Sequence, residues 1–170
     1  VIPSGTSIPT LGIVNTQQPI ILEPGTTAYI TTGRSPIGTS FRENKCSSYL
    51  EDFQDFEPSF YRNCPDPYSE FSTLYGPYYT RDTSCVDYVK RLPRCQTVLF
   101  PPDDLSTACK NFVKKHFSYN GCIATHYQDT DFFGNTWRVY LGMNDSMWRA
   151  RNEVVKLLDA SKRTIDAFAY

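Results

Sequence analysis

The six cysteines are the feature that most constrains how this sequence can fold. All of them lie in the middle of the chain: Cys46, Cys64, Cys85, Cys95, Cys109 and Cys122. An even number of cysteines in a loop-rich region is typical of disulfides formed in an oxidising compartment. Zinc is the alternative, but no two cysteines have the short C-x2-4-C spacing of paired zinc ligands. We therefore expect three disulfides within this region, and the spacing does not choose among the possible pairings.

The region around the cysteines is predicted to be helical. Apolar residues follow helical spacing in three segments: residues 46–56, 83–92 and 105–117. Prolines are expected to end the first two helices, and Asn120-Gly121 is a typical C-terminal stop for the third. Residues 68–79 are rich in tyrosine and are predicted to form an aromatic loop.

Strands are predicted on both sides of this region. Residues 137–141 alternate between apolar and polar side chains, as a half-buried strand does. Residues 154–158 and 164–170 are β-branched or aromatic runs, and the polar residues between them predict a hairpin. Near the N-terminus, residues 20–22 and 28–32 flank a Pro-Gly turn and are predicted to form another hairpin.

The alternation in the C-terminal strands predicts which side chains face the core. The inward set contains the apolar positions: Trp137, Val139, Leu141, Val155, Leu157, Ile165 and Ala167. Their polar neighbours are expected to face outward: Arg138, Lys156 and Asp166.

The order of these elements predicts an α+β chain. Residues 1–45 and 132–170 are expected to form a β-sandwich, because an apolar sheet face must be covered by a second layer. Residues 46–131 are expected to form a cysteine-rich helical insertion. Short helices are only marginally stable alone, and each disulfide adds about 2–4 kcal/mol to the stability of the fold. Disulfides are therefore most needed in the insertion.

The C-terminal sequence resembles the closing strands of the lamin tail domain, a family found in intermediate-filament tails and bacterial surface proteins. The matching features are Trp148 in a polar link, the run from Glu153 to Asp159, Thr164-Ile165-Asp166, and the final Tyr170. The Pro-Gly turn near the N-terminus is similar to an earlier part of that family. The resemblance implies an immunoglobulin-like β-sandwich. The long insertion and the few opening strands depart from the family pattern.

Composition excludes several classes of function. Lys and Arg number 17 against 18 Asp and Glu, so the basic excess of a nucleic-acid-binding protein is missing. The sequence has no run of about 18 apolar residues that would span a membrane. Its first ten residues lack the pattern of a signal peptide, so they are interpreted as a mature or trimmed start. The common nucleotide-binding, hydrolase and zinc-protease motifs are missing as well, and no cofactor is expected.

Two histidines and a group of tyrosines are the remaining candidates. His126 with Asp129 and Asp131 forms a His/carboxylate cluster that could bind a cation or orient a base, although such residues more often make a solvated turn. His116 lies on the apolar stripe of residues 105–117 and is expected to be a partly buried, hydrogen-bonded side chain. An exposed part of the aromatic loop could form a recognition surface: Tyr75, Tyr78 and Tyr79.

These observations favour a non-catalytic structural or adhesion module of an extracellular or cell-surface protein. Its expected partner is protein, including copies of itself joined through edge strands at one terminus. The alternative is a secreted metal-dependent hydrolase that uses His126, Asp129 and Asp131. Contact among these three side chains in a cleft would favour the alternative.

Overall fold

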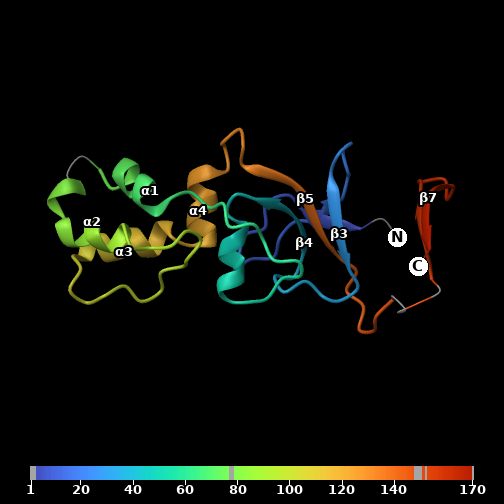
Figure 1. Ribbon diagram of the computed structural model, residues 1–170, viewed down its shortest axis with the longest axis horizontal. Coiled ribbons are helices and arrows are strands. Elements are labelled where there is room, and N and C mark those ends of the chain that lie inside the picture. Colours follow the sequence, from blue (N-terminus) through green and yellow to red (C-terminus); the bar gives the residue numbers. More distant parts are fainter. Residues whose placement is uncertain (1–2, 77–78, 148–150, 152, 170) are drawn as a thin grey trace.

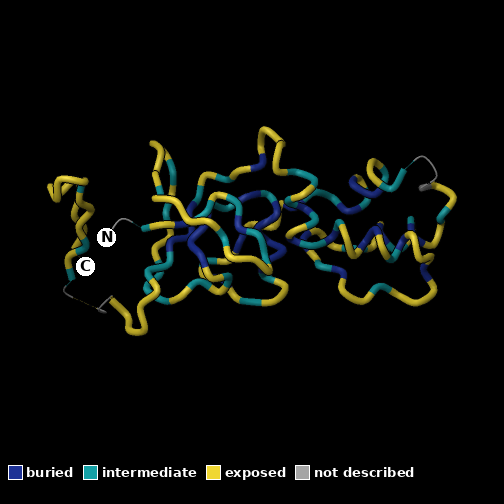
Figure 2. Tube along the Cα trace, turned by 180° about the vertical axis from the view of Figure 1, so that it is seen from behind, coloured by how far each residue is buried: buried dark blue, intermediate teal, exposed yellow. Residues whose placement is uncertain are grey.

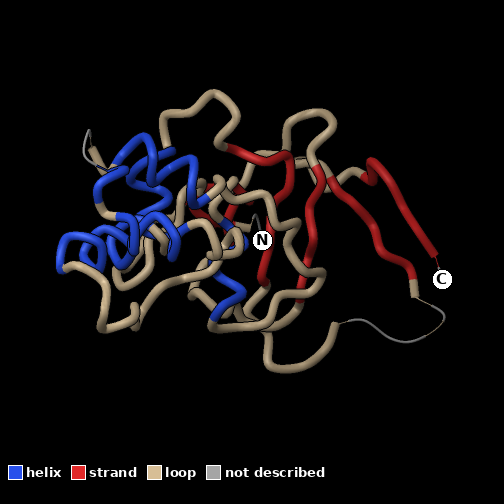
Figure 3. Tube along the Cα trace, turned by 60° about the vertical axis from the view of Figure 1, so that its left-hand side comes forward, coloured by secondary structure: helices blue, strands red, loops and turns tan. Residues whose placement is uncertain are grey.

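A block of helices lies at one end of an elongated molecule, and a sheet of five strands lies next to it (Figures 1 and 3). The computed structural model describes residues 3–76, 79–147, 151 and 153–169. The chain is therefore α+β, as expected. The predicted immunoglobulin-like sandwich is not confirmed, because the remaining two strands form a sheet of their own.

The longest strand of the larger sheet is β5 (Phe133–Tyr140), which starts four residues before the predicted strand. It pairs antiparallel with β4 (Ser40–Asn44) and parallel with β3 (Thr27–Thr31). Two short strands, β1 (Ser4–Thr6) and β2 (Gln18–Pro19), complete the order β2-β1-β4-β5-β3. The sheet thus joins the N-terminal part of the chain to the segment that follows the last cysteine.

The hairpin predicted near the N-terminus is wrong. The turn forms, since the Thr26 amide donates to the Glu23 carbonyl at 3.0 Å and Gly25 has a positive φ of 80°. However, residues 20–22 form no strand, and β3 pairs along its whole length with β5. A partner more than 100 residues away along the chain displaces the local one.

The helices lie between β4 and β5 in the sequence. They are η1 (Ser47–Asp52), α1 (Pro67–Leu74), η2 (Tyr79–Arg81), α2 (Thr83–Val89), α3 (Thr107–His116) and α4 (Tyr119–His126). The first predicted helix is thus a short 3-10 helix, whereas α2 and α3 lie within the predicted segments.

Helix α1 occupies part of the segment predicted to be an aromatic loop. Asp66 caps it by accepting a hydrogen bond from the Ser69 amide at 2.9 Å, and Pro67 lies at its first position. Proline fits there because the first-turn amides have no partner within the helix. Asp66 and Pro67 therefore form the start of a helix.

Gly121 was predicted to stop a helix, but it lies inside α4. A Cβ atom at this position would lie 2.0 Å from the carbonyl oxygen of Lys115, at the end of α3. Glycine is needed here because the two helices approach each other at their backbones.

The three disulfides are confirmed. They join Cys46 to Cys122, Cys64 to Cys95, and Cys85 to Cys109. The first closes the longest loop, with a sequence separation of 76 residues, and the other two lie within that loop.

Two hydrophobic cores divide the molecule. The sheet core contains eleven buried residues: Phe41, Cys46, Tyr49, Leu50, Phe56, Phe60, Cys64, Cys95, Tyr119, Cys122 and Phe132. The helical core contains nine: Phe71, Cys85, Val89, Val98, Leu105, Cys109, Phe112, Val113 and Phe117. Residues 46–131, predicted as one insertion, therefore contribute to both cores.

The prediction that Arg138 faces outward is wrong. Arg138 is 2% exposed and lies opposite Phe41 in the β4–β5 ladder, so it points into the sheet core. Its guanidinium pairs with Glu43, donates to the Pro58 carbonyl, and lies 4.4 Å from the centre of the Phe60 ring. An arginine can be buried when its donors are satisfied and its planar group stacks on an aromatic ring.

The neighbours of Arg138 point to the opposite face of β5. Trp137 and Val139 are buried there, as predicted, and Leu141 is half-buried. Both faces of the middle of β5 are therefore covered, which explains why inward and outward positions could not be separated by polarity.

The C-terminal hairpin is confirmed, but its predicted burial is not. Strands β6 (Val154–Leu158) and β7 (Thr164–Ala169) pair antiparallel and stand apart from the larger sheet (Figure 1). Leu157 and Ile165 are 57% and 64% exposed, and most of the hairpin is exposed (Figure 2). Ala167 is exposed as well, whereas Val155 is half-buried. Lys156 and Asp166 are exposed as expected.

The hairpin is exposed because no second sheet covers it in the described part of the chain. Trp148 and Tyr170, which carry part of the resemblance to the lamin tail domain, lie outside the described residues.

The two cores and the exposed hairpin predict different costs for apolar truncations. Phe41→Ala should lower the free energy of unfolding by about 3–5 kcal/mol, because Phe41 is fully buried. Leu157→Ala should change it by less than about 0.5 kcal/mol, as surface substitutions usually do. Urea unfolding of the two variants measures this difference, and equal costs would contradict the placement of the hairpin.

The close approach at Gly121 predicts a second effect. Gly121→Ala should destabilise the protein by about 1–3 kcal/mol, because the added methyl group must push α4 away from α3. Gly33→Ala is the control, since nothing lies within 4 Å of its added Cβ. Thermal unfolding followed by circular dichroism gives both values, and a neutral Gly121→Ala would show that the helices are not in backbone contact.

Candidate functional site

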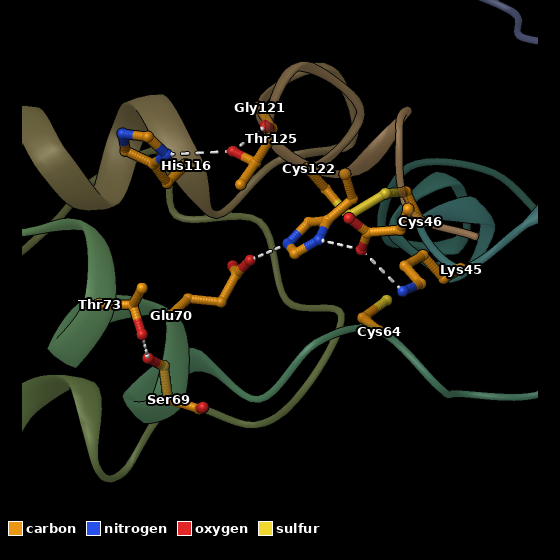
Figure 4. A network of polar contacts seen from close by, with 12 residues as sticks. Lys45, Cys46, Cys64, Ser69, Glu70, Thr73, His116, Gly121, Cys122 and Thr125 are labelled. Carbon is orange, nitrogen blue, oxygen red and sulfur yellow. Dashed lines mark hydrogen bonds and ion pairs between the residues drawn. A yellow bond between two sulfur atoms is a disulfide. The ribbon is translucent and has the colours of Figure 1, made fainter. Parts of the chain in front are cut away.

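Five charged side chains form a continuous chain of contacts between the two cores. Figure 4 shows the part of this chain that joins Glu70 to Lys45. In order, they are Glu70, His126, Asp129, Lys45 and Asp131. They come from three separate parts of the sequence, so the fold assembles the cluster.

Local structure holds each of these side chains in place. Glu70 lies in the first turn of α1, and His126 is the last residue of α4. Asp129 follows in a turn in which its amide donates to the His126 carbonyl at 2.9 Å. Lys45 directly follows β4, and its amide donates to the Phe132 carbonyl at 2.9 Å.

Both ring nitrogens of His126 face carboxylates. Nδ1 lies 2.8 Å from Oδ2 of Asp129, and Nε2 contacts Oε1 of Glu70. An ionised carboxylate can only accept hydrogen bonds, so this geometry favours the imidazolium form, in which both nitrogens carry hydrogen. Burial alone would lower the pKa of His126, but the hydrogen bonds to Glu70 and Asp129 outweigh it and raise the pKa above 6.5.

Lys45 occupies the position between the two aspartates. Its Nζ lies 2.9 Å from Asp129 Oδ2 and 2.5 Å from Asp131 Oδ1. The hydrogen bond from Lys45 is the main reason that the pKa of each aspartate lies below its usual value. The pKa of Lys45 is raised, because these bonds outweigh the lowering by burial.

The cluster predicted from sequence is thus only partly assembled as expected. His126 contacts Asp129, whereas Asp131 is joined to the cluster through Lys45 and makes no recorded contact with His126. The charged groups of the cluster are joined to one another by a chain of ion pairs. Within the described residues, no group of three or more His, Cys, Asp and Glu side chains has the arrangement to hold a metal ion.

Sequence reasoning missed Glu70 and Lys45. Glu70 lies 56 residues from His126 along the chain, and Lys45 lies 84 residues from Asp129. The Asp-Pro helix start would have placed Glu70 on a helix, but no local pattern could have placed that helix against α4.

A small cavity of about 230 Å³ lies beside the contact between His126 and Glu70. Its wall includes Ser69, Thr73 and Thr125. The hydroxyl of Thr73 donates to the Ser69 carbonyl at 3.0 Å, and that of Thr125 donates to the Gly121 carbonyl at 3.0 Å. These hydroxyls therefore bond to helix backbone rather than to the His126 ring.

A larger cavity of about 870 Å³ lies against the larger sheet and the loop that follows β5. Its wall includes Arg34, Tyr140 and Met143. Arg34 donates to the Asn144 side chain at 3.3 Å, which ties the loop to the segment after β3.

The other sequence candidates have structural partners. His116 stacks on Phe112 with ring centres 4.5 Å apart, and burial, followed by the charge of Lys115, lowers its pKa. Tyr75 packs at 4.5 Å from Phe71 and donates its hydroxyl to Asp82 at 2.8 Å. Tyr75 is therefore part of the helical block.

The rest of the predicted tyrosine surface cannot be placed. Tyr78 and the side chain of Tyr79 lie outside the described residues.

The hairpin β6–β7 is a second candidate, as a contact surface. It exposes five large apolar side chains by between 48% and 66%: Val154, Leu157, Leu158, Ile165 and Phe168. The paired register places Leu157 and Asp166 on one face, so Ile165 lies on the other. Both faces of the hairpin are therefore apolar in part.

The ion pairs of Lys45 predict how stability changes in acid. Because the folded pKa values of Asp129 and Asp131 are lowered, their contribution is present above the usual value of 3.8 and is lost as the pH falls through the lowered values. The melting temperature of the wild type should therefore fall more steeply below about pH 4 than that of Lys45→Met. Lys114→Met, at an exposed position, should behave as the wild type. Superimposable acid curves for all three proteins would contradict the ion-pair chain.

Comparisons with known proteins do not assign the chain to a family. No family model, no curated protein and no solved structure matches the sequence.

The described helices include none with the length and apolar character needed to cross a membrane.

Proposed function

We propose that this chain is a non-catalytic, extracytoplasmic structural or adhesion module that binds other protein through the hairpin β6–β7. The observation that carries the proposal is the exposure of apolar side chains on both faces of this hairpin. A contiguous exposed apolar surface usually marks a site of protein contact. A two-stranded hairpin is also marginally stable alone in water, so a partner that covers it would stabilise it.

The strand edges of the hairpin support the same role. In the described chain, β6 and β7 are paired in a ladder only with each other. Each strand therefore has an outer edge whose backbone donors and acceptors are available to another strand. At the N-terminus, by contrast, β1 already lies between β2 and β4 of its own sheet. Of the two ends, the C-terminal hairpin is thus the better candidate for strand addition.

The proposed partner is a second copy of the chain. Strand β3 is an edge strand of the larger sheet, and it exposes Tyr29 by 41% and Ile30 by 51%. A hairpin from one molecule added at β3 of the next would extend the sheet and bury apolar residues from both. Because this contact joins two different surfaces, repetition would generate a filament rather than a closed dimer.

The resemblance to the lamin tail domain fits this proposal. In that reading, the hairpin provides the closing strands of an immunoglobulin-like sandwich, and the strands that cover it come from another chain or another segment. The three disulfides support an oxidising location such as the cell surface. The engagement of both His126 ring nitrogens by carboxylates supports a non-catalytic role.

The test is self-association measured by sedimentation velocity over a range of protein concentrations. The wild type should form larger species as its concentration rises, and both Leu157→Lys and Ile165→Lys should abolish them. Each lysine places a charge on one face of the hairpin, and a buried unpaired charge disfavours contact.

Phe100→Lys is the matched control. Phe100 is 91% exposed and lies outside the hairpin, so this variant should associate as the wild type does. Circular dichroism should show that all three variants stay folded. A wild type that remains monomeric at every concentration, or a Phe100→Lys that loses association equally, would refute assembly through the hairpin.

A further inference from the structure

The contact between His126 and Glu70 crosses from one core to the other. Glu70 precedes Phe71, which is fully buried in the helical core. His126 lies four residues after Cys122, which is buried in the sheet core. The side chain of Glu70 is only 6% exposed and that of His126 is 18% exposed. A polar contact that is nearly closed to solvent therefore joins α1 to α4.

This contact depends on the proton count of the His126 ring. A neutral imidazole has one N–H donor and one nitrogen lone pair. Here each nitrogen faces a carboxylate oxygen, from Glu70 on one side and Asp129 on the other. Loss of one proton would therefore turn one hydrogen bond into a contact between two lone pairs.

The surrounding groups decide which of the two carboxylates is affected more when the His126 ring loses a proton. Asp129 has a second partner, because it also accepts from Lys45, which in turn holds Asp131. Glu70 faces the buried hydroxyl of Tyr49 on η1, whose pKa is raised by burial and then by the Glu70 charge. Glu70 has no recorded ion pair other than His126 in the described chain.

The sharper penalty on deprotonation therefore falls on Glu70. A buried carboxylate that loses its cation is strongly destabilising. Asp66 is a further acid near the contact of His126 with Glu70. It lines the small cavity beside that contact and caps α1.

We infer that His126 is a protonation-dependent clasp, which holds α1 against α4 while its ring is protonated and releases α1 as the pH rises. The clasp acts locally, because each core keeps its own disulfides and the backbone still joins the two cores when it opens.

The direction of this dependence follows from linkage. The folded pKa of His126 lies above its ordinary value of 6.5, because hydrogen bonds to the two carboxylates outweigh burial. A group with a raised folded pKa contributes stability that is complete below the ordinary value and is lost as the pH rises through the folded value. The clasp therefore opens on the alkaline side of 6.5.

The chain offers an internal comparison, because it has only two histidines. NMR titration of their ring signals should place the midpoint of His126 above 6.5 and that of His116 below it. His116→Gln assigns the two signals. In hydrogen exchange corrected for intrinsic rates, protection of the α1 amides should fall as the pH passes the His126 midpoint. The fall should be at most about tenfold for each unit by which that midpoint exceeds 6.5.

Glu70→Gln tests the clasp directly. It removes the charge that holds the imidazolium, so the His126 midpoint should move down toward 6.5 and the pH dependence of α1 protection should weaken. Glu23→Gln is the control at an exposed position and should leave both unchanged.

Three outcomes would overturn the inference. They are a His126 midpoint at or below that of His116, a midpoint that does not respond to Glu70→Gln, and α1 protection that stays constant across the His126 titration. The first measurement uses the wild-type chain, so it remains decisive even if a variant fails to fold.

Discussion

The disulfide between Cys46 and Cys122 is the constraint on which the rest of the structure depends. It closes a loop with a sequence separation of 76 residues at the point where the chain leaves the sheet core and returns to it. In a chain-entropy estimate, closing such a loop stabilises the folded state by about 4 kcal/mol. The ends of the helical block are thereby fixed beside β4 and β5. The same constraint places Lys45 and His126 close enough to share Asp129.

Local sequence signals predicted the elements that depend on neighbouring residues. The disulfides, α2 and the hairpin β6–β7 follow from cysteine count, helical spacing and a polar turn between apolar runs. Long-range contacts decided the rest. Gly121 has the sequence context of a helix end, yet its role is to let α4 approach Lys115. The pairing of β3 with β5 and the contact of Glu70 with His126 likewise join segments that no local pattern relates.

A buried arginine and a half-buried histidine organise the structure in a way that polarity patterns do not predict. Arg138 connects β5 to Glu43, to the Pro58 carbonyl and to the ring of Phe60. His126 connects α4 to α1 and to the turn that follows α4. Each cation satisfies several acceptors from different segments, so it specifies how those segments meet. A chain with short helices and short strands gains precise relative positions from such contacts as well as from its apolar cores.

The nesting of the disulfides has a consequence for how the chain responds to proteolysis. The segment that carries Leu99 and Phe100 is exposed, which is the kind of site that proteases cleave. A cut between these two residues lies inside the loop closed by Cys46 and Cys122 and also inside the loop closed by Cys85 and Cys109. The two pieces would stay covalently joined at both cores. A single cut within the helical block therefore leaves the two pieces covalently linked.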